Sequence, residues 1–290
     1  MEPIVESFFH GPTFTVSHLL IDPLSRNAAV IDPVLDFDQK SGRSATRFAE
    51  TILAAAAARG ARITALLETH AHADHLSAAQ FLKRRTGAWI GVGAEIVRIQ
   101  AYFRPIFGAG DMPIDGSAFD RLLAEGERIS LSSDAGALEI EVLHTPGHTP
   151  ACVSYRAGNA LFVGDTLFMP DYGTARTDFP GGNARTLYRS IRRLLSLPPE
   201  TRMFLCHDYK APGRDVFAWE TSIADQRARN VHIHDGIGED DFVRMRETRD
   251  AGLEMPALIL PAIQVNMRAG RWPPAEADGG VYLRLPVDRL

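Results

Sequence analysis

The stretch Thr69-His70-Ala71-His72-Ala73-Asp74-His75 concentrates three histidines and one carboxylate in a single short segment. An apolar run at residues 63–67 precedes the stretch and is typical of a β-strand. The segment that follows, residues 76–83, is typical of an α-helix. The four polar side chains are therefore predicted to lie on a turn between a strand and a helix.

The side chains of this turn can converge on one point. In an extended backbone, residues two apart point the same way, so His70 and His72 face a common side. Asp74 is a suitable N-cap for the helix, which lets His75 turn back toward the pair. Imidazole nitrogens and carboxylate oxygens bind zinc, iron and manganese, so we interpret the stretch as a metal site rather than as unrelated polar residues.

The same arrangement recurs further along the chain. The alternating strand at residues 138–142 leads to Pro146-Gly147-His148, and another apolar run leads to Gly164-Asp165. A third apolar run, residues 203–206, ends at His207. A strand-based scaffold that collects metal ligands along one edge predicts this recurrence, whereas chance placement of 10 histidines in 290 residues predicts it poorly.

The rest of the chain predicts a mixture of strands and helices. Residues 14–21 and 28–31 are expected to form an N-terminal hairpin, followed by a polar loop at 36–42. A helix is expected at residues 44–59 because its apolar residues recur at helical spacing. Further along, a turn at residues 134–136 is expected to join two strands.

Composition places the chain among ordinary globular proteins. Of its 290 residues, 45% are hydrophobic and 23% are charged, and the formal net charge is -5. This balance argues against general nucleic-acid binding. No apolar run of about 18 residues predicts a membrane span, and no basic segment at the start predicts a signal peptide. We therefore expect a cytoplasmic protein in which Cys152 and Cys206 are small buried thiols.

The order of these motifs resembles the metallo-β-lactamase superfamily. His-x-His-x-Asp-His, Pro-Gly-His, Gly-Asp and a strand-end histidine follow one another between His70 and His207. The resemblance implies an α/β (α+β) fold, an αββα sandwich of two mixed sheets flanked by helices, with the site at one edge. We expect a catalytic domain over residues 1–218, and a helical and loop extension over residues 219–290 that packs on the same domain.

The flanking residues resemble the persulfide dioxygenase branch of that superfamily and proteins labelled β-lactamase hydrolase-like. The motifs that carry this resemblance are residues 69–75, His148-Thr149-Pro150 with Cys152, Gly164-Asp165-Thr166-Leu167, residues 175–179 and Cys206-His207-Asp208-Tyr209. In the dioxygenase family one iron is bound by residues that match His70, His148 and Asp165. Two histidines and one carboxylate form the ligand set of non-haem Fe(II) oxygenases, which leaves positions on the metal open.

The resemblance implies one Fe(II) per chain and the oxidation of glutathione persulfide by O2 to sulfite and glutathione. Two reactants held on one metal have already lost their translational freedom, which lowers the barrier to their reaction. The remaining four residues of the pattern would then surround the metal and orient its ligands and water: His72, Asp74, His75 and His207.

The same seven residues could instead hold two metal ions, either two zinc ions or one iron and one zinc ion, as in glyoxalase II and other hydrolases of this fold. One metal would take His70, His72 and His148 and the other Asp74, His75 and His207, with Asp165 as the bridge. A bound hydroxide would attack a thioester or lactam carbonyl. The number of ligands does not decide between the two enzymes, and the flanking motifs favour the dioxygenase. A non-catalytic metal-binding protein is a third hypothesis.

Three further residues are expected to bind the substrate. Arg176 has a planar guanidinium that suits a glutathione carboxylate, and a salt bridge that fixes its own loop is the alternative. Tyr209 and Lys210 follow His207 and are expected to border the pocket. The expected partners are a small-molecule thiol persulfide and O2, without nucleic acid or membrane, and the family resemblance implies a homodimer.

Overall fold

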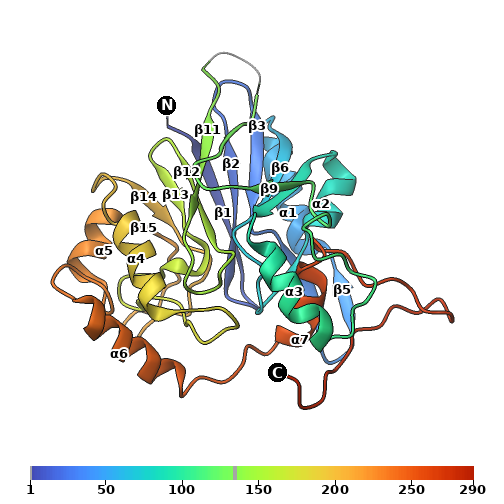
Figure 1. The fold of residues 1–290 in the computed structure, drawn as a ribbon. Helices are drawn as coiled ribbons and strands as arrows, with labels where there is room; N and C mark the ends of the chain where they lie inside the picture. Colours follow the sequence, from blue (N-terminus) through green and yellow to red (C-terminus); the bar gives the residue numbers. More distant parts are fainter. Residues whose placement is uncertain (1, 133–135) are drawn as a thin grey trace.

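Two six-stranded β-sheets pack face to face in the computed structural model, which describes residues 2–132 and 136–290 (Figure 1). The first sheet has the strand order β1-β2-β3-β6-β8-β9 and the second the order β10-β11-β12-β13-β14-β15. The strands of the first sheet are β1 (Ile4–His10), β2 (Thr15–Ile21), β3 (Asn27–Ile31), β6 (Arg62–Glu68), β8 (Trp89–Gly93) and β9 (Arg121–Leu123). Those of the second are β10 (Arg128–Ser130), β11 (Glu139–His144), β12 (Val153–Ala157), β13 (Ala160–Phe162), β14 (Arg202–Phe204) and β15 (Glu220–Ser222).

Helices cover the outer faces of both sheets (Figure 1). On the first sheet they are α1 (Arg47–Ala58), α2 (Ala79–Thr86), α3 (Ile96–Ile106) and α7 (Ile259–Asn266). On the second they are α4 (Ala184–Leu194), α5 (Ile223–Arg229) and α6 (Glu239–Asp250). A small third sheet has the order β5-β4-β7 and is made of β4 (Val34–Asp38), β5 (Arg43–Ala45) and β7 (Leu76–Ser77). The αββα sandwich predicted from the sequence is confirmed.

Alternation along the central strands explains why the fold has layers on both sides. In β2, Leu19 and Ile21 contribute to the core beneath the helices, whereas Leu20 contributes to the core between the sheets. In β3, Val30 contributes to the core beneath the helices and Ile31 to the core between the sheets. All five side chains are fully buried. Successive side chains of a strand point to opposite faces, so apolar residues at every position require cover on both faces.

The predicted N-terminal hairpin is confirmed, because β2 and β3 pair antiparallel with Leu20 opposite Ala29. The sequence analysis did not assign β1, which extends this hairpin by pairing with β2. The loop predicted at 36–42 is wrong in part, since β4 continues to Asp38 and pairs with β5. The turn predicted at 134–136 falls largely on residues 133–135, which lie outside the described residues.

The helix predicted to begin beside Asp74 starts later in the structure. Leu76 and Ser77 form β7, which pairs with β4, and α2 begins only at Ala79. The prediction that Asp74 caps this helix is therefore wrong, because α2 has no side-chain cap. The helix ends as expected at Gly87, whose φ of 76° is the left-handed conformation that glycine adopts without strain.

Residues beyond 218 contact both sheets. Strand β15 pairs with β14 at the edge of the second sheet, and α7 packs against β7 and the core beneath the first set of helices. The division into a domain over 1–218 and an extension over 219–290 stays a prediction. Within the described ranges, helices of the length and apolar character needed to cross a bilayer are lacking.

Candidate metal centre

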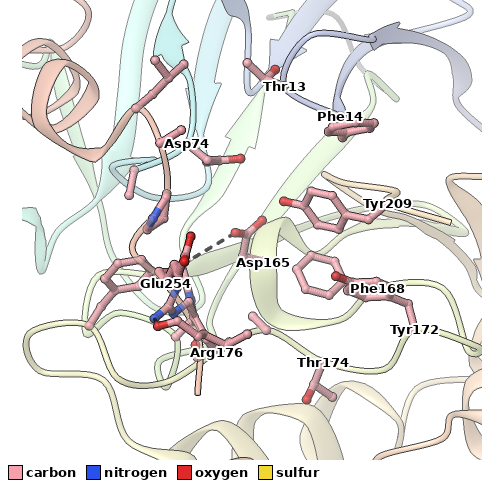
Figure 2. Close-up of a pocket in the computed structure, with 18 of the residues that line it drawn as sticks. Thr13, Phe14, Asp74, Asp165, Phe168, Tyr172, Thr174, Arg176, Tyr209 and Glu254 are labelled. Carbon is pink, nitrogen blue, oxygen red and sulfur yellow. Dashed lines mark hydrogen bonds and ion pairs between the residues drawn. The ribbon is translucent and has the colours of Figure 1, made fainter. Parts of the chain in front are cut away.

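All seven predicted ligand residues gather at one edge of the sandwich, just beyond the ends of strands. His70, His72, Asp74 and His75 lie on the irregular segment after β6, His148 on the turn between β11 and β12, Asp165 in the 3-10 turn Gly164–Thr166 after β13, and His207 shortly after β14. Figure 2 shows the carboxylates of Asp74 and Asp165 facing the pocket that opens at this edge.

Three of these residues form a compact first set. The Nε2 atoms of His70 and His148 lie 3.8 and 3.7 Å from the same Oδ2 atom of Asp165. The ligand atoms of all three lie within 4.8 Å of one another, and the three residues are buried. The two separations exceed a hydrogen bond of about 2.7–3.2 Å, so these atoms do not pair directly. They are close enough to be ligands of one ion.

Hydrogen bonds at the opposite nitrogens orient the two imidazoles of the first set. The Nδ1 atom of His70 lies 3.1 Å from Oγ1 of Thr69, whose hydroxyl donates to Oδ2 of Asp32 at 2.9 Å. The Nδ1 atom of His148 lies 2.8 Å from the carbonyl oxygen of Arg176. Because neither partner has a proton to offer, we assign the ring proton to Nδ1 in both histidines. Nε2 then keeps the lone pair that a metal ligand requires.

A second set of four possible ligands lies beside the first, again with ligand atoms within 4.8 Å of one another: His72, Asp74, His75 and His207. The Nε2 atom of His207 lies 3.1 Å from Oδ2 of Asp74 and 3.3 Å from Oδ1 of Asp165. Asp165 therefore presents one oxygen to each set, which is the position of a carboxylate that can bridge two ions.

His72 lies between the two sets. Its ring centre is 4.0 Å from that of His70 and 4.1 Å from that of His75. Its Nε2 atom is 3.0 Å from Oδ1 of Asp32, so Nδ1 is the nitrogen left for a metal. The sequence analysis placed His72 with His70 and His148 in the two-metal alternative, whereas here its nitrogen groups with the second set.

Burial makes the imidazoles of His70 and His72 poor bases. Burial, and next the neighbouring imidazoles, hold the pKa values of His70 and His72 well below the usual range. Burial also acts to lower the pKa of His207, but the carboxylates of Asp74 and Asp165 outweigh it and raise that pKa. Neutral imidazoles beside two carboxylates offer the lone pairs and the negative charge that a divalent cation needs.

The residues present fit a metal. Six buried ligand atoms form no hydrogen bond among the described residues: Nε2 of His70, Nδ1 of His72, Oδ2 of Asp74, Nε2 of His75, Oδ1 of Asp165 and Nε2 of His207. The Nε2 atom of His207 is within ion-pair distance of the two carboxylate oxygens, and within the described structure the other three atoms have no such contact at 3.5 Å or less. Leaving a buried polar atom unpaired costs about 1–3 kcal/mol, so such atoms are rare and seldom cluster. One or two divalent cations at this edge would give these atoms their missing partners.

Asp32 belongs to the site, although the sequence analysis did not assign it. Its carboxylate accepts hydrogen bonds from the main-chain N–H of Thr69 at 2.7 Å and from the Thr69 hydroxyl, and it contacts His72. These contacts fix the position of the segment after β6, which carries four of the possible ligands. Asp32 directly follows β3, so the signal that identified the other residues, an acidic side chain just past an apolar strand, would also have found it.

A cavity of about 400 Å³ opens onto the ligands (Figure 2). At its metal side lie Asp74, His148 and Asp165. Five aromatic rings contribute to its wall: Phe14, Phe168, Tyr172, Phe179 and Tyr209. Residues 246–258, from α6 and the loop after it, supply another part. A largely apolar wall with a polar, metal-binding end suits a small organic substrate that reacts at one terminus.

Arg176 lines this cavity, but its guanidinium is already engaged. It donates to both carboxylate oxygens of Asp178, each at 2.6 Å, and to the carbonyl of Glu254 at 2.6 Å. Its carbon centre also lies 5.0 Å from the ring centre of Phe179. This is the loop-fixing arrangement that the sequence analysis left open, and it joins the loop before α4 to the loop after α6.

Tyr209 and Lys210 lie differently from each other. Tyr209 lines the cavity, and Figure 2 shows its hydroxyl turned toward Asp74 and Asp165. Removal from water, followed by the negative charge of those carboxylates, raises the pKa of Tyr209 well above its usual range, so the phenol keeps its proton. Lys210 is not part of the cavity wall, and its ammonium lies 4.5 Å from the ring centre of Phe217.

Arg249 is a cavity residue that the sequence analysis missed. It lies on α6, its side chain is exposed, and it makes no ion pair with any residue in the described part of the chain. The neighbouring Arg246 is buried and occupied, because it donates to Asp250 and to the carbonyl of Thr174. Both arginines line the cavity, and no local pattern distinguishes them, since only the packing of α6 decides which one is paired.

Comparison with known proteins agrees with this geometry. The sequence profile of the Metallo-beta-lactamase superfamily matches residues 11–207. A "Probable metallo-hydrolase" of Burkholderia pseudomallei is 54% identical, with 99% of each chain covered. A "Beta-lactamase hydrolase-like protein" of Agrobacterium fabrum is 47% identical over 99% of this chain, which spans 65% of that longer protein.

Persulfide dioxygenases are more distant relatives. "Persulfide dioxygenase ETHE1, mitochondrial" of Homo sapiens is 28% identical over 92% of this chain and 89% of its own. The crystal structure of ETHE1 from Myxococcus xanthus is 30% identical, with a TM-score of 0.73 over 92% of this chain and 100% of that one. The sandwich, the order of the strand-end ligands and these matches lead to one conclusion: the chain belongs to the metallo-β-lactamase superfamily.

Proposed function

We propose that this protein is an iron-dependent persulfide dioxygenase that oxidises glutathione persulfide with O2 to sulfite and glutathione. The observation that carries the proposal is the first ligand set, in which His70 and His148 approach one oxygen of Asp165 beside the cavity. Two histidines and one carboxylate are the ligand set of non-haem Fe(II) oxygenases. Similarity to ETHE1 over 92% of the chain supports the proposal.

The overall reaction balances with one water: GSSH + O2 + H2O gives GSH + sulfite + two protons. Fe(II) would supply open positions at which the persulfide sulfur and O2 are held side by side. The contribution of the protein is to hold the ligands still, through the Thr69 hydroxyl at His70 and the Arg176 carbonyl at His148.

The cavity offers charges that suit the ends of glutathione. Arg249 supplies a cation without an ion-pair partner among the described residues, suited to a carboxylate of the tripeptide. Glu254 supplies an exposed anion at the same wall, suited to the ammonium group (Figure 2). Phe14 and Phe168 supply apolar surface for the sulfur-bearing part of the substrate.

A binuclear hydrolase of thioesters is the second candidate. It is favoured by the second ligand set, whose buried atoms also lack hydrogen-bond partners, and by the position of Asp165 between the sets. The relative with 54% identity is named a probable metallo-hydrolase. Two ions at this edge would activate a hydroxide for attack on a thioester carbonyl.

Oxygen uptake separates the candidates. The protein is purified without added metal, its metal content is measured, and it is loaded with iron and mixed with glutathione persulfide in an oxygen-electrode cell. The expected result is one iron per chain and oxygen uptake that disappears in Asp165→Asn. Absence of uptake in protein that holds one iron per chain overturns the proposal. Two metals per chain with hydrolysis of lactoylglutathione establishes the second candidate instead.

A further inference from the structure

The segment that carries four of the possible metal ligands has no regular secondary structure. Residues 70–75 lie between β6 and β7, and neither helix nor strand bonds their main chain. In the described structure no main-chain N–H donates to the carbonyl of His72 or of His75. Because the side chains of this segment gather at one edge without regular secondary structure, contacts from outside the segment have to set its path.

The buried side-chain amide of Asn266, near the C-terminal end of the chain, holds the main chain of this segment in place. The Nδ2 group of Asn266 donates to the carbonyl of His72 at 2.8 Å and to the carbonyl of His75 at 2.7 Å. Its Oδ1 atom accepts from the main-chain N–H of Ser77 at 2.8 Å. Asn266 is 4% exposed, so water does not replace these bonds. A single side chain therefore holds the middle and the end of the ligand segment in place.

The position of Asn266 is itself fixed. It is the last residue of α7, whose Ile263 and Val265 are buried in the core beneath the first set of helices. Just after the helix, Gly270 adopts a φ of 80° and passes so close to Ser77 that an added Cβ would lie 3.0 Å from its carbonyl oxygen. The packing of α7 in the core and the close approach of Gly270 to Ser77 therefore fix the position of the Asn266 amide beside the ligand segment.

We propose that Asn266 is a positioning residue for the metal centre, and that helix α7, which lies outside the part matched by the superfamily profile, completes that centre. The amide uses both of its donors on the carbonyls of His72 and His75, two of the four possible ligands of the second set, on the segment that also carries His70. Loss of the amide releases these carbonyls, the segment shifts, and the imidazoles no longer meet at one point. Groups that support metal ligands in this way change metal affinity by about 10–100-fold.

The inference rests on a metal being bound at this edge, and it is independent of whether the reaction is an oxidation or a hydrolysis. Its test therefore measures metal binding rather than turnover. A failure of the proposed dioxygenase activity leaves it standing, and a failure here leaves the proposed activity untouched.

The chain offers a matched control on the same helix. Gln264 is also buried and also makes three hydrogen bonds through its amide, to Leu260 and Arg284, but none to the ligand segment. Asn266→Ala and Gln264→Ala therefore remove the same kind and number of bonds from α7. Asn266→Asp keeps the shape and the acceptor for Ser77 while it loses both donors.

The experiment compares these variants as full-length proteins. Metal-free protein is titrated with Co(II) in competition with a chelator, its visible absorption spectrum is recorded, and its stability is measured by urea unfolding. We expect Asn266→Ala and Asn266→Asp to lose about 10–100-fold in Co(II) affinity with an altered spectrum, and Gln264→Ala to keep both. If Asn266→Ala does not fold without metal, Asn266→Asp provides the comparison. Co(II) binding as tight as that of Gln264→Ala, with the wild-type spectrum, overturns the inference.

Discussion

The guanidinium of Arg176 donates hydrogen bonds to both carboxylate oxygens of Asp178, each at 2.6 Å. The main-chain carbonyl of the same arginine accepts a hydrogen bond from Nδ1 of His148. The loop before α4 is therefore fixed at the point where it supports a metal ligand. We expect Arg176→Gln and Asp178→Asn to destabilise the protein, because each breaks a bidentate pair. A double-mutant cycle by urea unfolding should give a coupling energy of about 1–2 kcal/mol.

The same cycle distinguishes a loop-fixing role of Arg176 from a substrate-binding role. If Arg176 binds the substrate, Arg176→Gln raises KM for the persulfide while Asp178→Asn leaves KM and stability unchanged. If it fixes the loop, the two variants behave alike. Steady-state kinetics and unfolding measured on the same preparations decide between these outcomes.

Arg249 is expected to bind a carboxylate of the substrate. Its side chain is exposed at the cavity wall and has no ion pair in the described structure. Arg249→Gln should weaken glutathione binding up to about fivefold, since an ion pair at an exposed site contributes about 0.2–1 kcal/mol. Isothermal titration of metal-free protein with glutathione measures the loss.

Arg244 provides the control for this prediction. It lies on the same helix, α6, but pairs with Asp241 on the surface and does not line the cavity. Arg244→Gln should therefore leave glutathione binding unchanged. Equal effects of the two substitutions would show that only the net charge of the helix matters, contrary to the prediction.

The number of bound metals determines how Asp165 and His72 compare. With one metal, Asp165 is a ligand and His72 only orients its surroundings, so Asp165→Asn should weaken iron binding more than His72→Ala does. With two metals both residues are ligands, and the two substitutions should have comparable effects. Metal content per chain, measured by elemental analysis in each variant, separates the cases.

His18 should make folding sensitive to acid. Burial lowers its pKa from 6.5 to about 4, and its ring lies 2.8 Å from Ser7 Oγ and 3.1 Å from the carbonyl of Leu205. Below pH 6.5 the unfolded chain binds a proton at this residue that the folded protein excludes, so stability falls as the pH drops from 6.5 toward 4. The full loss is about 3 kcal/mol.

This pH dependence is measured on metal-free protein, so that the binding of an ion does not contribute. Urea unfolding near neutral pH and at about pH 5 should show a smaller decrease for His18→Gln than for the wild type, because glutamine does not titrate. An equal decrease in both proteins would assign the acid sensitivity to other groups.

Much of the fold and of the site could be predicted because the signals are local. The ends of β6, β13 and β14 follow from apolar runs, and each strand is followed within three residues by His70, Asp165 or His207. The start of α2 could not be predicted in the same way. Residues 76–77 have helical neighbours in the sequence, but β7 pairs with β4, and that pairing overrides the local preference.

The ion-pair partners of charged side chains could not be predicted from the sequence either. Nothing in the sequence distinguishes Arg176, which pairs with Asp178 and the main chain of Glu254, from Arg249, which faces the cavity without an ion pair in the described structure. Both are arginines in polar surroundings. Their difference arises from the way α6 and the following loop pack over the edge of the sandwich.

The sequence by itself predicted the strand ends and the histidines and carboxylates that follow them, because strand periodicity and strand ends are properties of short segments. The sandwich that joins these strands was implied by the resemblance to the superfamily. Tertiary structure alone decided that Asp165 stands between two ligand sets and that Asn266 reaches the carbonyls of His72 and His75. Such contacts join residues that are far apart in the chain. They exist only once the two sheets and the last helix have packed together, and no local pattern records them.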